Sequence, residues 1–149
     1  VQYPNAESEK KILTLARNAA SQKPIAPPEV VTQANLFAMR KDVLDIHMAD
    51  SIENYIVQLT MATRTPEQYG EELDRWIEFG VSPRGTIALD RCARAHAWLN
   101  GRDFVSPDDV QAMLPDVFRH RLLLSFEAEA SGVSADQVIA QLLKVVPVV

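Results

Sequence analysis

Apolar residues recur at intervals of three and four along much of the chain, the spacing of amphipathic α-helices. The pattern predicts one helix over residues 5–21, a second from a cap at Thr32 to about Val43, and a third from a cap at Asp50 to about Arg64. Between the first and second of these helices, three prolines predict a linker over residues 22–31. We expect the second and third helices to belong to the core. The apolar contacts expected of the second come from Leu36, Phe37, Met39, Leu44 and Ile46.

The clearest helix prediction covers residues 83–99, because Ser82 and Pro83 suit its start and Gly101 suits its end. At 100° per residue this helix has two unequal stripes. We expect its apolar stripe to face inward, and this stripe consists of Ala88, Cys92, Ala95 and Leu99. A neighbouring basic stripe, beside Ile87 and Trp98, consists of Arg84, Arg91 and Arg94.

The remaining segments predict shorter elements. Residues 65–80 form the least regular interior stretch, and a helix from Ser106 should reach about Met113. A final helix begins at Ser134 with capping-box spacing and ends before Pro147. Extended pieces are expected at 104–105 and 122–124. The fold class is therefore mainly α, a helical bundle with at most a few very short strands.

Composition places the chain among ordinary globular proteins. Of its 149 residues 47% are hydrophobic and 23% charged, and no run of about 18 apolar residues would cross a membrane. A single cysteine, Cys92, excludes an internal disulfide and fits a cytoplasmic location. The net charge of −5 argues against broad binding to nucleic acid or anionic membrane. The start, Val1-Gln2-Tyr3-Pro4, indicates the interior of a longer protein.

Two residue pairs suggest chemistry that we assign to structure instead. Cys92 and His96 stand four apart on a helix, which can place two ligands on one metal, but two ligands do not make a site, so no metal is predicted. Asp108 and Asp109 follow a Ser-Pro helix start, where acidic side chains interact favourably with the helix dipole. We therefore interpret both aspartates as capping residues.

Arg84 is the candidate binding residue. A cation at a helix start is disfavoured by the dipole, typically by about 0.3–1 kcal/mol, so the arginine of Gly80-Val81-Ser82-Pro83-Arg84-Gly85 calls for another explanation. A bound polyphosphate provides one, and a solvated arginine beside an ordinary cap is the alternative. The chain has no G-x-x-x-x-G-K-[ST] loop of its own to hold nucleotide phosphates.

From that motif outward the sequence resembles the C-terminal lid of MoxR-type AAA+ ATPases. Gly80–Leu89 resembles the start of the family's sensor-2 helix. The other matching blocks, in order, are Tyr3-Pro4 with the acidic helix after it, Val43–Arg64, Gly101–Val110, and His120–Leu122 with Glu127–Glu129. Their order and spacing cover nearly the whole chain. The resemblance divides it into a helix and linker leaving the ATPase core, residues 1–31, and a helical lid, residues 32–149.

The resemblance implies a ring-forming protein that hydrolyses ATP with Mg²⁺ and has a chaperone-like role in the maturation or assembly of other proteins. Its expected partners are the N-terminal AAA+ core of the same chain, neighbouring ring subunits and a protein with a von Willebrand factor A domain. Arg84 matches the sensor-2 arginine that reaches the γ-phosphate, and Arg91 is a second candidate for nucleotide binding. The Walker A and Walker B motifs have no counterpart, so this fragment alone should bind no cofactor and hydrolyse no ATP.

Two other functions remain open from the residues. A helical nucleic-acid-binding module could use the basic stripe of residues 84–94, although the acidic composition argues against nucleic acid as a partner. A non-catalytic adaptor could accept partner helices in apolar grooves and would need no phosphate.

Overall fold

The computed structural model describes residues 4–21 and 31–148. The chain divides into two compact units, Val1–Leu36 and Phe37–Val149, and each is described by itself. The predicted linker over residues 22–31 falls almost wholly outside the described residues. Helix α1, Ala6–Ala20, is capped by Asn5, whose Oδ1 accepts a hydrogen bond from the Ser8 amide at 2.9 Å. None of its residues is buried.

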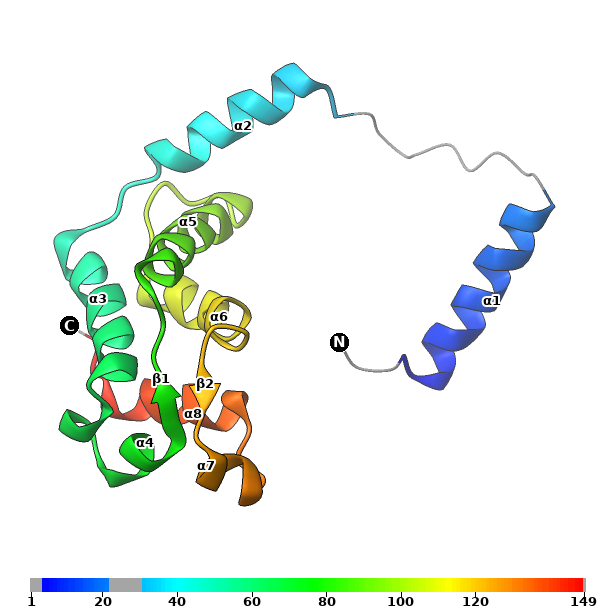
Figure 1. Cartoon of the computed structure of the whole chain (residues 1–149). Helices are drawn as coiled ribbons and strands as arrows, with labels where there is room; N and C mark the ends of the chain where they lie inside the picture. The colour runs from blue at the N-terminus through cyan, green and yellow to red at the C-terminus, as the bar shows by residue number, and fades with distance from the viewer. Residues whose placement is uncertain (1–3, 22–30, 149) are drawn as a thin grey trace. The chain divides into compact units, whose positions relative to one another are not determined.

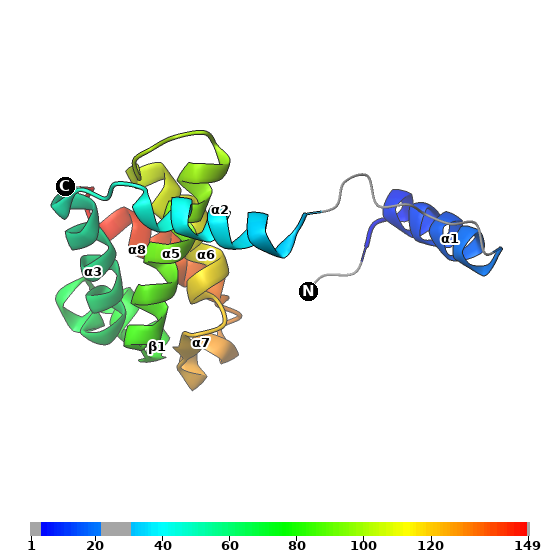
Figure 2. The same ribbon diagram turned by 90° about the horizontal axis from the view of Figure 1, so that it is seen from above.

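The larger unit is a helical bundle, which confirms the predicted mainly α class (Figure 1). After α2, Gln33–Asp45, three long helices follow: α3, Asp50–Arg64, α5, Pro83–Leu99, and α6, Pro107–Phe118. Figures 1 and 2 show α3 and α5 side by side, and α5 packs on α6. Helix α8, Ala135–Val145, packs against α3, α4 and α6. Three short helices complete the bundle: η1, Pro66–Gln68, α4, Glu71–Trp76, and α7, Phe126–Ala130.

The sheet is minimal, as the sequence indicates. Strand β1, Ile77–Phe79, pairs antiparallel with β2, Leu123–Leu124. A separate parallel bridge joins His47 to Phe104, and the Val105 amide donates to the His47 carbonyl at 2.9 Å. The bridge ties the segment before α3 to the loop before α6.

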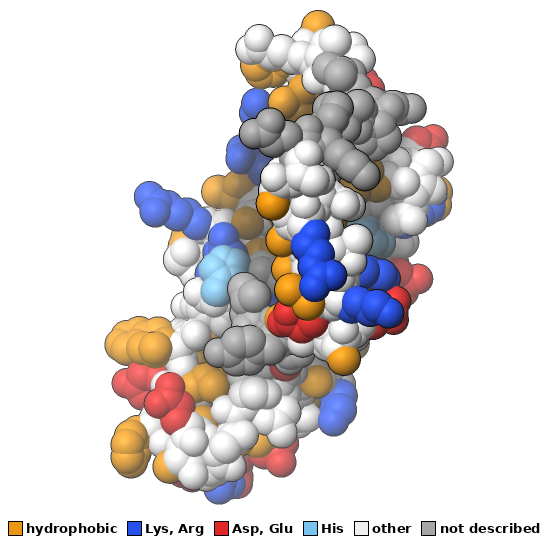
Figure 3. All heavy atoms as spheres, turned by 90° about the vertical axis from the view of Figure 1, so that its right-hand side faces the viewer, with side chains coloured by type: hydrophobic (Ala, Val, Ile, Leu, Met, Phe, Trp, Pro, Cys, Tyr) orange, Lys and Arg blue, Asp and Glu red, His pale blue; other side chains and the backbone are white. Residues whose placement is uncertain are grey.

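One core fills the space between these helices. Its fully enclosed members come from every long element of the bundle and include Tyr55, Leu59, Leu73, Val81, Leu89, Leu114, Phe118, Ile139 and Leu142. Around β1, β2 and α7 three large apolar side chains remain exposed: Phe79, Leu123 and Phe126. Figure 3 shows hydrophobic side chains beside acidic ones at the lower end of the molecule.

The expected core role of the second helix is wrong. Helix α2 has no buried residue, and Leu36, Phe37 and Leu44 are more than half exposed. Its apolar residues are spread around the helix and leave no apolar face to pack. Ile46, directly after α2, is the residue of that set that enters the core.

The inward face of the helix over residues 83–99 also differs from the prediction. The buried residues of α5 are Gly85, Leu89, Ala93 and Ala97, whereas Leu99 is 75% exposed. This row lies one position away from the expected stripe, of which Ala88 and Cys92 are half-buried. Small side chains let α5 approach its neighbours on more than one side, so apolar character alone does not select the face.

One helix is longer than predicted, and one stretch is more regular than predicted. The helix that starts at Ser106 does not stop at Met113 but runs through Pro115 to Phe118. An interior proline removes a backbone hydrogen bond and destabilises a helix by about 3 kcal/mol. The free energy gained by burying Leu114 and Phe118 offsets this loss. The irregular stretch at residues 65–80 contains η1 and α4, and the buried Leu73 explains why α4 forms.

Candidate functional site

The candidate site lies at the start of α5. Ser82 has the extended backbone of an N-cap residue and Pro83 is the first helical residue, as predicted, but the Ser82 side chain makes no capping hydrogen bond. The Gly85 amide instead donates to the Ser82 carbonyl at 2.8 Å. The first turn contains no acidic residue. The first turn of α5 thus has no capping side chain and no acid, and it contains a cation, Arg84. Each of the other described helices has either an acidic residue in its first turn or a capping side chain.

This start is held in place through Val81, which is fully buried. The Val81 amide donates to Thr63 Oγ1 at 2.9 Å, and its carbonyl accepts from Arg64 Nε at 2.8 Å. Both partners belong to the last turn of α3. The residue before the α5 cap is thus fixed by the end of another helix.

Two glycines of the motif are required by close packing. A Cβ added to Gly80 would lie 2.2 Å from the Thr63 carbonyl oxygen, and one added to Gly85 would lie 2.1 Å from Val81 Cγ1. Neither position has room for a side chain unless the backbone or Val81 moves. The motif therefore packs closely against the end of α3 and fixes the start of the helix that presents Arg84.

The structure separates the three arginines of the predicted basic stripe. Arg84 and Arg91 are exposed, and neither guanidinium makes a hydrogen bond or ion pair to another described residue. Seven residues place them about 10.5 Å apart along the helix axis. The side chain of Arg94 is only 17% exposed, donates to Asp90 Oδ1 at 3.0 Å and also bonds the Ile46 carbonyl. Arg94 is thus a structural residue.

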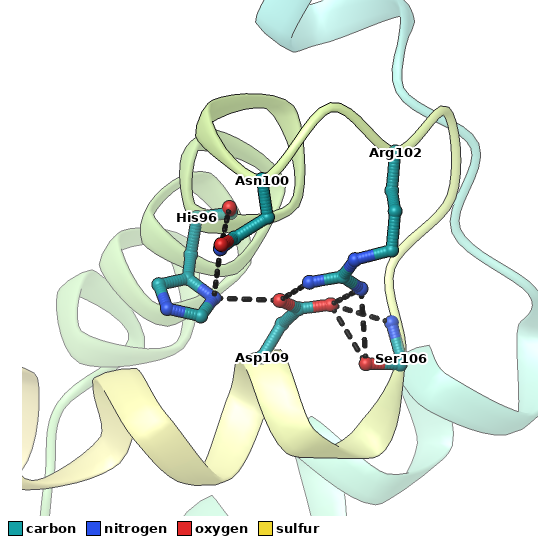
Figure 4. Close-up of polar contacts among 5 residues, drawn as sticks. All are labelled: His96, Asn100, Arg102, Ser106 and Asp109. Carbon is teal, nitrogen blue, oxygen red and sulfur yellow. Dashed lines mark hydrogen bonds and ion pairs between the residues drawn. The ribbon is translucent and has the colours of Figure 1, made fainter.

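A buried polar cluster lies at the opposite end of α5 (Figure 4). Its centre is Asp109, whose side chain is completely buried in the first turn of α6. Both Arg102 Nη groups donate to the two carboxylate oxygens at 2.5 Å, and His96 Nδ1 lies 2.6 Å from Oδ1. The Ser106 amide and hydroxyl each donate to Oδ2 at 2.8 Å. The cluster fastens the α5–α6 connection.

The environment of Asp109 stabilises its charged form. Burial alone would raise the pKa of the carboxyl group, but the hydrogen bonds from Arg102, Ser106 and His96 outweigh it and hold the pKa well below its ordinary value. The carboxylate in turn raises the pKa of Arg102. Capping describes only part of the role of Asp109, because its buried carboxylate also binds Arg102 and His96. Asp108 beside it is exposed, as expected of a residue that only interacts with the helix start.

His96 uses its Nδ1 for Asp109, so its pairing partner is a carboxylate from α6 and not Cys92. Within residues 4–21 and 31–148 no group of three metal-binding side chains converges. No helix in the same described ranges is long and apolar enough to cross a membrane.

Comparison with known proteins connects this geometry to a family. Residues 73–142, which contain the α5 start and the Asp109 cluster, match the AAA lid domain family. Over 150 residues the chain is 33% identical to Chaperone MoxR1 of Mycobacterium tuberculosis, a match that covers 98% of this chain and 38% of that protein. It is 44% identical over 84 residues to Protein MoxR of Paracoccus denitrificans, covering 53% of this chain and 25% of the relative.

A solved structure agrees with the sequence relatives. The crystal structure of a proposed ATPase from Cytophaga hutchinsonii matches with a TM-score of 0.89 at 33% identity, covering all of this chain and 45% of that one. The chain therefore spans less than half the length of these three relatives. The sequence blocks, the helical fold and these relatives agree, and the chain belongs to the lid regions of MoxR-family AAA+ proteins.

Proposed function

We propose that this chain is the lid of an AAA+ ATPase with a chaperone-like role, and that Arg84 is its sensor-2 residue, which reaches the γ-phosphate of ATP. The observation that supports this role is the exposed guanidinium of Arg84 at an uncapped helix start without acidic neighbours in the first turn. Both the guanidinium and the positive end of the helix dipole favour an anion there.

Arginine suits this task because its planar, permanently charged fork can bind two phosphate oxygens at once. Bound ATP, with Mg²⁺, supplies the phosphoanhydride bond whose hydrolysis drives the cycle. The protein contributes a positive charge on a rigid element, since the Val81 anchor and the two glycines fix where α5 begins. A fixed charge aimed at a transferring phosphoryl group is worth orders of magnitude in rate.

In the complete protein we place residues 1–31 between the ATPase core and a lid formed by residues 32–149. When ATP at Arg84 is hydrolysed, the lid would move relative to the core. This mechanism requires an AAA+ core from the same chain and neighbouring subunits in a ring. A cytoplasmic location and a partner with a von Willebrand factor A domain complete the proposal. The tie between Arg94, Asp90 and Ile46 weighs against the nucleic-acid alternative, because it takes one arginine out of the basic stripe.

Steady-state ATP hydrolysis by the full-length parent and its Arg84→Ala variant tests the proposal. We expect turnover to fall at least about tenfold, because a charge that stabilises the transferring phosphoryl group is lost. Size-exclusion chromatography and thermal unfolding establish that both proteins assemble and fold alike. Unchanged turnover with intact assembly would return Arg84 to a solvated helix-start residue and favour the adaptor function.

Arg91→Ala belongs in the same assay. This arginine is equally exposed, lies on the same helix two turns away and differs from Arg84 in its distance from the helix start. A loss comparable to that of Arg84→Ala would make Arg91 a second nucleotide-binding residue. Wild-type turnover would leave Arg84 alone in that role on α5.

A further inference from the structure

Arg64 lies beside the α5 start although it precedes Arg84 by 20 residues in the sequence. It is the last residue of α3, and its Nε donates to the Val81 carbonyl at 2.8 Å. Val81 is separated from the first residue of α5 by Ser82 alone. The hydrogen bond therefore fixes the Arg64 guanidinium next to the helix start that presents Arg84.

A shared depression in the surface supports this placement. Residues of α3 and of the first two turns of α5 line a hollow of about 290 Å³. Its lining includes Val57, Met61, Arg64, Pro83 and Ile87. Arg64 and Pro83, the residue before Arg84, thus line the same hollow, whose walls are mostly apolar, while Arg84 itself lies outside this lining.

The hydrogen-bonding capacity of Arg64 is largely unused. A guanidinium carries five N–H donors, and the bond to Val81 occupies the one on Nε. The side chain is exposed, and its two Nη groups contact no acceptor among the described residues. This leaves the paired Nη groups, the part of arginine that binds phosphate in a bidentate manner, available at a fixed place.

We infer that Arg64 is a second phosphate-binding arginine, which contacts the same bound nucleotide as Arg84. The inference rests on the proposed function, because it assumes that the α5 start faces the nucleotide phosphates. It follows from contacts between α3 and α5 that sequence spacing does not reveal. Along α5 itself the nearest exposed arginine is Arg91, two turns beyond Arg84.

Arg64→Gln is a sharp test, because the glutamine Nε2 occupies the same place along the side chain as the arginine Nε. The variant can keep the hydrogen bond to Val81 but loses the charge and the Nη fork. Arg75→Gln is the matched control, since Arg75 is exposed and pairs with Glu71 on α4. Affinity is measured in the full-length parent by ATP displacement of a fluorescent ATP analogue, and melting temperatures report folding.

We expect Arg64→Gln to weaken ATP binding at least about tenfold, the effect of losing one charge-assisted phosphate contact, while its melting temperature stays that of the wild type. Arg75→Gln should bind ATP as the wild type does. An affinity for Arg64→Gln within about twofold of the control would overturn the inference. If Arg64→Gln unfolds, Arg64→Lys, which retains the charge and loses the fork, takes its place and should still weaken binding.

The double variant Arg64→Gln/Arg84→Ala separates direct contact from mere positioning. If Arg64 binds phosphate itself, the double variant binds ATP more weakly than Arg84→Ala alone. If Arg64 only holds Arg84 in place, adding Arg64→Gln to Arg84→Ala changes nothing, and the inference fails. Arg84→Ala with wild-type affinity and turnover would refute the proposed function instead, whatever Arg64 does.

Discussion

Asp109→Asn should destabilise the lid more than any other change of one charged group in the α5–α6 connection. Asparagine has nearly the same shape, so the cavity term is small and the loss is electrostatic. The substitution removes a completely buried carboxylate that receives hydrogen bonds from Arg102, His96 and Ser106. It also turns an amide N–H₂ group toward donors that need an acceptor.

The size of the effect follows from the burial of the partners. Removing one member of a buried ion pair costs about 3–5 kcal/mol. The Arg102 and His96 side chains are about a third exposed and can regain water, which reduces the expected loss for Asp109→Asn to about 2–4 kcal/mol. For a chain of this size the melting temperature should fall by roughly 5–15 °C. Asp108→Asn, one residue away and exposed, is the matched control and should lose at most about 1 kcal/mol.

Urea denaturation of both variants and the wild type, followed by circular dichroism, measures these free energies of unfolding. The pKa of Asp109 is lowered on folding, so its stabilisation is fully present above the unfolded pKa of about 4 and is lost as the pH falls through the folded value. The wild-type advantage over Asp109→Asn should therefore shrink below about pH 4. A free energy for Asp109→Asn within about 0.5 kcal/mol of Asp108→Asn at pH 7 would refute this account of the cluster.

Two further predictions concern packing on and around α5. Leu89→Ala should lower the free energy of unfolding by about 2–5 kcal/mol because Leu89 is fully buried, whereas Leu99→Ala, at a 75% exposed position, should lower it by less than about 0.5 kcal/mol. Equal losses in urea denaturation would contradict the face assigned to α5. Gly80→Ala should lower the free energy of unfolding by about 1–3 kcal/mol, because the added Cβ would lie 2.2 Å from the Thr63 carbonyl oxygen. Ser82→Ala removes no capping hydrogen bond, so its stability in thermal unfolding should stay within about 0.5 kcal/mol of the wild type.

Much of the bundle could be predicted because local signals determine helix ends. Ser134 and Gln137 form the expected capping box, and Pro83 and Gly101 bound α5 within a residue or two of where the structure places them. Such signals act over three or four residues and need no knowledge of the fold. The family blocks added the architecture that local signals do not contain.

The role of Asp109 could not be read from the sequence, because a first-turn aspartate after Ser-Pro looks the same whether it is exposed or buried. Its burial depends on how α5 packs on α6, and its partners lie before α6, in the loop and on the preceding helix. The same reason applies to Arg64, whose place beside α5 depends on the contact between Thr63 and Val81. Pairing across elements is decided by tertiary packing, and a single sequence gives no direct signal of it.

The Asp109 cluster also bears on how the chain folds. His96 and Asp109 are 13 residues apart, and Arg102 and Asp109 only 7, so the loops that these contacts close are short and their entropic cost is low. The helices that they join, α5 and α6, form the most extensive helix pair of the bundle. Contacts of low sequence separation carry a small loop-closure cost, and we therefore expect the α5–α6 pair to be part of the folding nucleus. Substitutions that weaken the cluster should accordingly slow folding more than they accelerate unfolding.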